Sequence, residues 1–121
     1  MDADLAEFVE TSFGSVWAVE TLLFLRRERE RNWTYEELVQ QLRSSDAVVT
    51  EAAERLVVSG LLTADENGAV RYAPASPDLE RLADRLEAEY GKAPSAVRRM
   101  IVQTPLSKLR SFADAFKVTR T

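Results

Sequence analysis

The chain has 121 residues, of which 45% are hydrophobic and 30% charged, and its net charge at pH 7 is −4. This composition can bury a core and suits a single domain, and it is too apolar for a disordered chain. Cysteine and histidine are both absent, so disulfides, thiol chemistry and the commonest general base and metal ligand are excluded, and we expect a non-enzymatic chain without metal or cofactor.

Two helices are predicted at the start of the chain. Helical spacing of the apolar residues between 5 and 9 predicts a short helix that ends near Gly14. The stretch SVWAVETLLFLRRERER predicts a long second helix with Ser15 as its cap. Its apolar residues cover more than one stripe, so this helix either runs through the middle of the domain or buries a second face against another subunit. We expect Trp17 to pack in the core.

The clearest helix signal is the stretch TYEELVQQLRS. Thr34 and Glu37 form a T-x-x-E capping box, in which each side chain satisfies a free backbone amide. The apolar residues that follow fall on one face of the helix. Trp33, which precedes the cap, is expected to act as a hydrophobic staple against the second helix.

After a break at residues 44–45, a further helix is predicted over residues 46–59. Its apolar residues again form one buried face, and Gly60 is expected to end it in the left-handed conformation. Glu51 and Arg55 lie one turn apart on this helix. An ion pair between these two side chains is the simplest expectation for Arg55.

A β-hairpin is predicted next, with residues 61–64 paired to residues 70–73. The dipeptide Asn67-Gly68 favours a primed two-residue turn between the strands. A two-stranded hairpin is unstable alone, so it must lie against the preceding helices.

The rest of the chain is predicted to be helical. Ser76 and Pro77 are typical of a helix start, and Gly91 is expected to close this helix. The stretch PSAVRRMIVQ predicts a shorter helix, and Thr104 begins the last one. That last helix has an apolar side made of Leu106, Leu109, Phe112, Ala113 and Phe116.

Charge is distributed unevenly along the chain. Between residues 34 and 73 there are seven acidic residues and three basic ones, whereas between 92 and 121 there are seven basic residues and one acidic one. No stretch approaches the ~20 apolar residues that a membrane span needs, and the acidic start lacks the basic region of a signal peptide. We therefore expect a cytoplasmic protein with no membrane partner.

The order of these elements resembles the winged helix-turn-helix superfamily, and in detail bacterial regulators of the MarR and related types. The resemblance rests on WTYEELVQQL and AVVTEAAERLVVSGLL for the two helices of the motif and on TADENGAVRYAP for the wing. It implies a mostly helical fold with a small β-hairpin wing and added N- and C-terminal helices. Residues 1–73 would form the winged helix-turn-helix domain with its N-terminal helix. Residues 74–121 would form a helical extension suited to dimerisation.

The resemblance also implies a transcriptional regulator, acting as a homodimer, that places helix 46–59 in the major groove of DNA and the wing on the adjacent backbone. Serine and threonine could bond phosphates or bases there, and arginine could reach a guanine edge. The candidate DNA-binding residues are Ser44, Ser45, Thr50, Arg55 and Arg71.

The acidic balance of residues 34–73 departs from this pattern, because affinity for DNA comes mainly from neutralised phosphates. The alternative is a winged-helix protein–protein interaction module that does not bind DNA directly. Such a module would meet its partner through the acidic helix 46–59 or the basic region 92–121. A continuous acidic surface over that helix would favour a protein partner. DNA would be favoured if one face gathered Arg26, Arg27, Arg43, Arg55 and Arg71.

Overall fold

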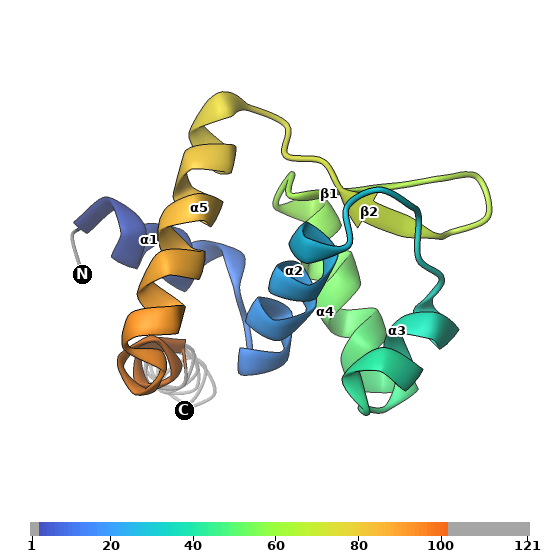
Figure 1. The fold of residues 1–121 in the computed structure, drawn as a ribbon, viewed down its shortest axis with the longest axis horizontal. Coiled ribbons are helices and arrows are strands. Elements are labelled where there is room, and N and C mark those ends of the chain that lie inside the picture. The colour runs from blue at the N-terminus through green and yellow to red at the C-terminus, as the bar shows by residue number, and fades with distance from the viewer. Residues whose placement is uncertain (1–2, 102–121) are drawn as a thin grey trace, which may run out of the picture.

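A computed structural model describes residues 3–101 (Figure 1). The elements are α1 (Ala3–Ser12), α2 (Val16–Arg27), α3 (Tyr35–Leu42), α4 (Asp46–Val58), β1 (Leu62–Ala64), β2 (Val70–Tyr72) and α5 (Pro77–Lys92). Residues 94–101 are also helical. The chain is therefore mostly helical with a small two-stranded antiparallel sheet. The predicted last helix, which begins at Thr104, lies outside the described residues.

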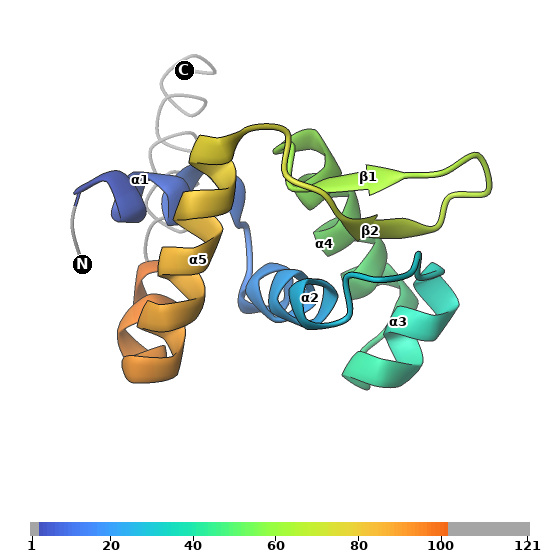
Figure 2. The ribbon, with the colours of Figure 1, turned by 45° about the horizontal axis from the view of Figure 1, so that its top comes forward.

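The long helix α2 occupies the middle of the fold. Figures 1 and 2 show α1 and α5 on one side of it and α3, α4 and the hairpin on the other. Its residues Ala18, Val19, Leu22 and Leu25 are fully buried, which confirms that it runs through the domain. The prediction for Trp17 is wrong, since this side chain is 37% exposed. Helical spacing places it on the side of α2 that carries Glu20 and Phe24, away from the buried residues.

The capping box of α3 is confirmed. Thr34 Oγ1 accepts a hydrogen bond from the Glu37 amide at 3.1 Å, and Glu37 Oε1 accepts one from the Thr34 amide at 2.9 Å. Arg43 ends the helix with a φ of 53°, and its backbone amide donates to Val39. Only residues 43–45 then separate α3 from α4, so the two helices form a tight pair.

Residues adjacent in the sequence determine where α4 begins and ends. Ser45 caps it by accepting the amide of Val48 at 3.3 Å. Gly60 has a φ of +82°, as predicted, and the amide of the following Leu61 donates to Leu56 at 3.0 Å. This is the Schellman arrangement, which turns the chain sharply from α4 into β1.

The predicted strand pairing is confirmed, but the predicted turn is wrong. Ala64 pairs with Val70, so five residues form the connection. Only Gly68 has a positive φ, and its amide donates to the Asp65 carbonyl at 3.0 Å, which is typical of a type I turn followed by a glycine bulge. The Asp65 carboxylate favours this wider loop, because its Oδ1 accepts the amides of Asn67 and Ala69 at 2.9 and 3.0 Å.

The hairpin is attached to the helices at the segment before α3. Trp33 and Val70 exchange two backbone hydrogen bonds of 2.7 and 2.8 Å, which form an isolated bridge beside β2. The Trp33 ring is buried and packs edge-to-face on Phe24 of α2, with ring centroids 4.9 Å apart. Trp33 therefore packs against the second helix, as predicted, and it also anchors the sheet.

Helix α5 begins as predicted and ends differently. Ser76 accepts the amide of Leu79 at 3.2 Å, and Pro77 is at the first helical position. Gly91, which was expected to close the helix, lies inside it, and Ala93 is the cap. The reason is Pro94, because the residue before a proline disfavours the helical conformation.

A single hydrophobic core joins both sides of α2. It includes buried residues of α1, α2, α4 and the hairpin together with Ala83 and Leu86 of α5 and Val97 and Ile101 beyond it. Within residues 3–101 no single helix is long and apolar enough to cross a membrane. Helices α1 and α2 would be so only as a pair, and they meet at an angle of 103°.

Two glycines with positive φ offer a matched test of this packing. A Cβ on Gly60 would lie 3.3 Å from Leu79 of α5, whereas a Cβ on Gly68 would meet nothing within 4 Å. Both alanine variants strain the backbone, so we expect Gly68→Ala to lower the free energy of unfolding by about 1 kcal/mol and Gly60→Ala by about 2 kcal/mol. Urea denaturation measures both. Equal losses would mean that α5 does not press on the end of α4.

Candidate functional site

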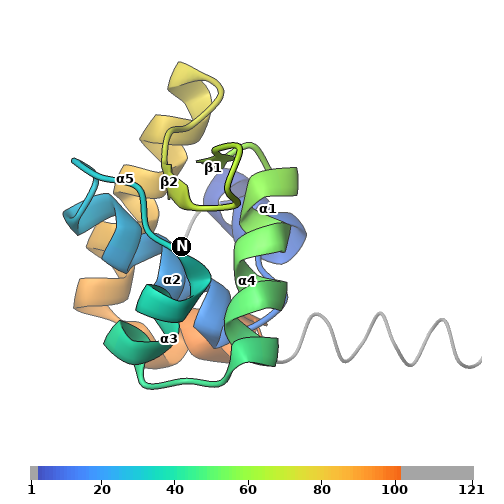
Figure 3. The same cartoon turned by 90° about the vertical axis from the view of Figure 1, so that its right-hand side faces the viewer.

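The most distinctive surface belongs to α4, which lies at one edge of the molecule in Figure 3. Its buried side faces α2 and carries Val49, Ala52, Ala53 and Leu56. The opposite side, which we call the α4 outer face, consists of Ala47, Glu51, Glu54 and Val58, all exposed. Val58 is 87% exposed, an unusual position for an apolar side chain. The α4 outer face therefore combines two carboxylates with an apolar residue and carries no cation.

The candidate hydroxyl residues lie around the start of α4. Ser45 is exposed, and its hydroxyl already accepts the Val48 amide in the helix cap. Ser44 and Thr50 are half-buried. Their hydroxyls are thus not gathered on the α4 outer face, and Ser45 has a structural role in addition to any contact it makes.

Arg55 is exposed beside the α4 outer face, and its guanidinium is directed toward Gly14. A Cβ built on Gly14 would lie 3.0 Å from Arg55 Cζ, so the guanidinium lies across the turn between α1 and α2. The predicted ion pair with Glu51 is wrong, since it is not among the ion pairs of the described residues. The side chain runs back toward Gly14 instead of along its own helix.

Two further cations remain exposed near this surface. Arg71 lies on β2 opposite Thr63, and Arg43 ends α3. The loop of the hairpin carries Asp65, and the Asn32 side chain together with backbone amides of the loop holds the pKa of that carboxyl below its usual range. The loop therefore stays negatively charged at neutral pH.

Two arginines just after α2, Arg29 and Arg31, contact other side chains of the protein. Arg31 lies over the Trp33 ring at 3.9 Å and pairs with Glu37. The backbone amide of Thr34, and after it Arg31, lowers the pKa of the Glu37 carboxyl. Arg29 lies over the Tyr72 ring at 5.1 Å. These contacts hold both guanidinium groups against the base of the hairpin.

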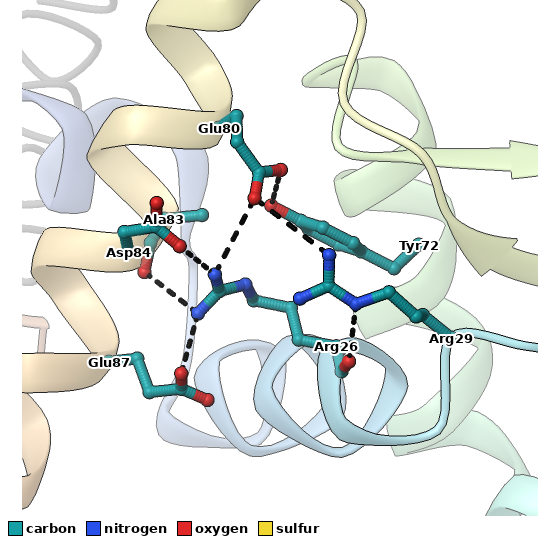
Figure 4. Close-up of polar contacts among 7 residues, drawn as sticks. All are labelled: Arg26, Arg29, Tyr72, Glu80, Ala83, Asp84 and Glu87. Atoms are coloured by element: carbon teal, nitrogen blue, oxygen red, sulfur yellow. Dashed lines mark hydrogen bonds and ion pairs between the residues drawn. The ribbon is translucent and has the colours of Figure 1, made fainter.

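Arg26 is the only buried charged residue among the described ones, with an exposed fraction of 4%. Figure 4 shows it between α2, β2 and α5. Its Nη1 donates to Glu87 Oε2 at 2.8 Å and to the Ala83 carbonyl at 3.3 Å. Its Nη2 pairs with Asp84 and lies 3.8 Å from Glu80. We call this group of residues the Arg26 cluster.

Tyr72 completes the Arg26 cluster from the hairpin. Its ring centroid lies 5.3 Å from the guanidinium, and its hydroxyl donates to Glu80 Oε2 at 2.7 Å. Burial, and after it the hydrogen bond to Glu80, raises the pKa of Tyr72 to about 12. Burial alone would lower the pKa of Arg26, but Tyr72 and the carboxylates raise it above its ordinary value.

The Arg26 cluster resembles a catalytic constellation in composition only. Its carboxylates are occupied by the guanidinium, and within residues 3–101 no group of three acidic residues is placed to hold a metal ion. We interpret it as the joint that fixes α5 and the hairpin to α2. Sequence reasoning missed it, although Glu80, Asp84 and Glu87 have the spacing of one helix face.

No protein-family model, curated protein or solved structure matches this chain. The resemblance to winged helix-turn-helix regulators therefore stays a prediction, and the function has to be argued from the geometry of the chain itself.

Removing the buried cation should weaken the whole domain. We expect Arg26→Met to lower the free energy of unfolding by about 2 kcal/mol, below the usual loss for a broken buried pair because the abandoned carboxylates can be hydrated. Arg27→Met, at the exposed neighbouring position, should change it by less than about 0.5 kcal/mol. Thermal or urea unfolding of both variants measures the difference. An unchanged free energy of unfolding for Arg26→Met would show that the other contacts of α5 are sufficient to hold it.

The tyrosine pKa values give a pH test of the same cluster. The pKa of Tyr72 is about 12 in the folded chain and 10.0 ordinarily, so its contribution to stability is intact below pH 10 and is lost as the pH rises toward 12. Burial also raises the pKa values of Tyr35 and Tyr90. Phenolate absorbance should therefore develop above pH 10. Tyr72→Phe should remove the part of the increase that occurs at the highest pH. If Tyr72→Phe instead removed absorbance that develops at lower pH, the highest tyrosine pKa would not belong to Tyr72.

Proposed function

We propose that the chain is a non-enzymatic winged helix-turn-helix protein that binds a basic surface of a protein partner through the α4 outer face and acts in regulation. The single observation that carries this proposal is the composition of that face, where the exposed Glu51, Glu54 and Val58 stand together. Two exposed carboxylates on one side of α4 favour a protein partner over DNA.

The arrangement of the elements supports the winged-helix part of the proposal. Helices α3 and α4 are joined by a three-residue turn, and the hairpin follows α4 directly. The bridge between Trp33 and Val70 ties the hairpin to the start of α3. In a winged helix this order leaves the outer side of the second motif helix free for a partner.

Electrostatics decides which partner fits that side. A duplex presents closely spaced phosphates, and the carboxylates of Glu51 and Glu54 would be repelled where a groove-binding helix needs cations. A protein partner can instead offer lysine or arginine to these carboxylates and an apolar contact to Val58. Charged residues around a small apolar centre are the usual composition of a non-obligate interface.

A matched pair of charge reversals tests this proposal. The double variant Glu51→Arg/Glu54→Arg inverts the α4 outer face, and Glu7→Arg/Glu30→Arg makes the same change of net charge at exposed positions elsewhere. Proteins captured from cells that contain the chain should be retained by the wild type and by the second variant and lost with the first. Equal retention by all three would move the interface away from α4. Circular dichroism checks that each variant folds.

A second candidate function is a DNA-binding transcriptional regulator, as the family resemblance implies. The observation that favours it is the exposure of Ser45, Arg43 and Arg71 around the start of α4 and on β2. In this reading the three residues would contact phosphates, and a homodimer would be needed to gather enough cations.

A salt series with random-sequence duplex DNA separates the two candidates. Under the first proposal the wild type does not bind duplex even at low salt. Glu51→Arg/Glu54→Arg gains weak, salt-dependent binding, because two carboxylates are replaced by two cations. Clear binding by the wild type that falls steeply with salt, and is weakened by Arg71→Ala, would reverse the order of the candidates.

A further inference from the structure

A hollow of about 550 Å³ lies between α1 and α5. Figures 1 and 2 show that α5 crosses α1 there. The apolar part of its lining consists of Phe8 from α1 and of Leu79 and Leu82 from α5. None of its lining residues belongs to the α4 outer face or to the Arg26 cluster. A hollow of this volume with an apolar lining is within the usual range of sites that bind small organic molecules.

A buried hydroxyl without a hydrogen bond opens onto this hollow. Ser12, the last residue of α1, lines the hollow and is only 7% exposed. Its carbonyl accepts the Ser59 hydroxyl, but within residues 3–101 its own hydroxyl has no hydrogen-bond partner. In the same range, Arg26 Nε is the only side-chain nitrogen or oxygen that lacks a partner and is also fully shielded from solvent. The Ser12 hydroxyl therefore still reaches solvent through the hollow, and a ligand that bonded to it would satisfy it.

The charges around the hollow are unevenly compensated. On α5, Arg81 pairs with Asp78, and Arg85 is engaged as well. On α1, Asp4 and Glu7 lie one turn apart and are exposed. Neither carboxylate is among the ion pairs of the described residues. The charge that is left without a counterion is therefore negative and lies on the α1 side.

We propose that this hollow binds a small organic cation, an amine with an apolar body and a second polar group. The ammonium group pairs with Asp4 and Glu7, the apolar body packs on Phe8 and the two leucines, and the polar group bonds to the Ser12 hydroxyl. Along α1, Ser12 lies five residues after Glu7 and eight after Asp4, so the two polar groups of the ligand are about 8–12 Å apart. This inference goes beyond the proposed function, because it adds a small-molecule ligand through residues that lie outside α4.

The sign of the ligand charge gives the first test. With the full chain labelled at its leucine methyl groups, we expect 4-phenylbutylamine to bind saturably and to shift the NMR signals of Leu79 and Leu82. We expect the anion 4-phenylbutanoate, which has a similar apolar body, to bind about tenfold more weakly because it meets carboxylates instead of pairing with them. Binding of the anion as tight as that of the amine would overturn the proposal. So would the absence of amine binding, or saturation by the amine without a shift of either leucine.

Two matched double variants locate the amine. Asp4→Asn/Glu7→Gln neutralises the carboxylates of the hollow, and we expect it to lower the affinity for 4-phenylbutylamine by about fivefold. Glu51→Gln/Glu54→Gln removes the same charge from the α4 outer face and should leave that affinity unchanged. Equal losses in the two variants would show that the amine responds only to net charge, and would overturn the site. Circular dichroism checks that each variant folds.

The role of Ser12 is tested with a hydroxylated probe. We expect 4-(4-hydroxyphenyl)butylamine to bind about fivefold more tightly than 4-phenylbutylamine, because its phenol can donate to the Ser12 oxygen. Ser12→Ala should remove this advantage and keep the affinity for 4-phenylbutylamine. An advantage that persists in Ser12→Ala would overturn the placement of the ligand. None of these results alters the proposal for α4, which is tested by the retention of a protein partner.

Discussion

The fold depends on one buried charge. Arg26 lies where α2, β2 and α5 meet, and its guanidinium contacts carboxylates that all come from one face of α5. An arginine suits this place better than a lysine, because its planar fork reaches several acceptors at once and stacks on Tyr72. Without it, the half of the molecule built from α1 and α5 would be joined to the half built from α3, α4 and the hairpin by apolar contacts and a few hydrogen bonds such as that from Tyr72 to Glu80. Every surface discussed above is presented by elements that this joint holds in place.

The same joint explains why charge along the sequence is a poor guide to charge on the surface. Arg26 is buried, Arg29 and Arg31 lie on aromatic rings, and Arg55 lies against Gly14. Arg26 is therefore not available to a DNA-binding surface, whereas Arg27, Arg43, Arg55 and Arg71 are exposed. Glu51 and Glu54 of α4 are also exposed. Two of the seven acidic residues between 34 and 73, Glu51 and Glu54, thus lie together on the α4 outer face.

Local signals predicted the elements well, and contacts between distant residues account for the errors. Thr34 with Glu37, Ser76 with Pro77, and Gly60 act within one turn of chain, so their roles can be predicted from the sequence. The exposure of Trp17 and the direction of Arg55 depend on which helices pack together, which spacing alone does not reveal. The Arg26 cluster joins residues 58 positions apart. The end of α5 is different, because Pro94 was visible in the sequence and outweighs Gly91.

Val58 and Trp17, the two large apolar side chains that are exposed among residues 3–101, lie on different surfaces of one core. Arg55 of α4 contacts Gly14, and Gly14 precedes α2, in which Trp17 is the second residue. Both surfaces are formed by capped helices whose other sides are buried, so neither has to become ordered when it is occupied. Binding to a preformed surface avoids most of the entropy cost of ordering, and a small contact can then be specific.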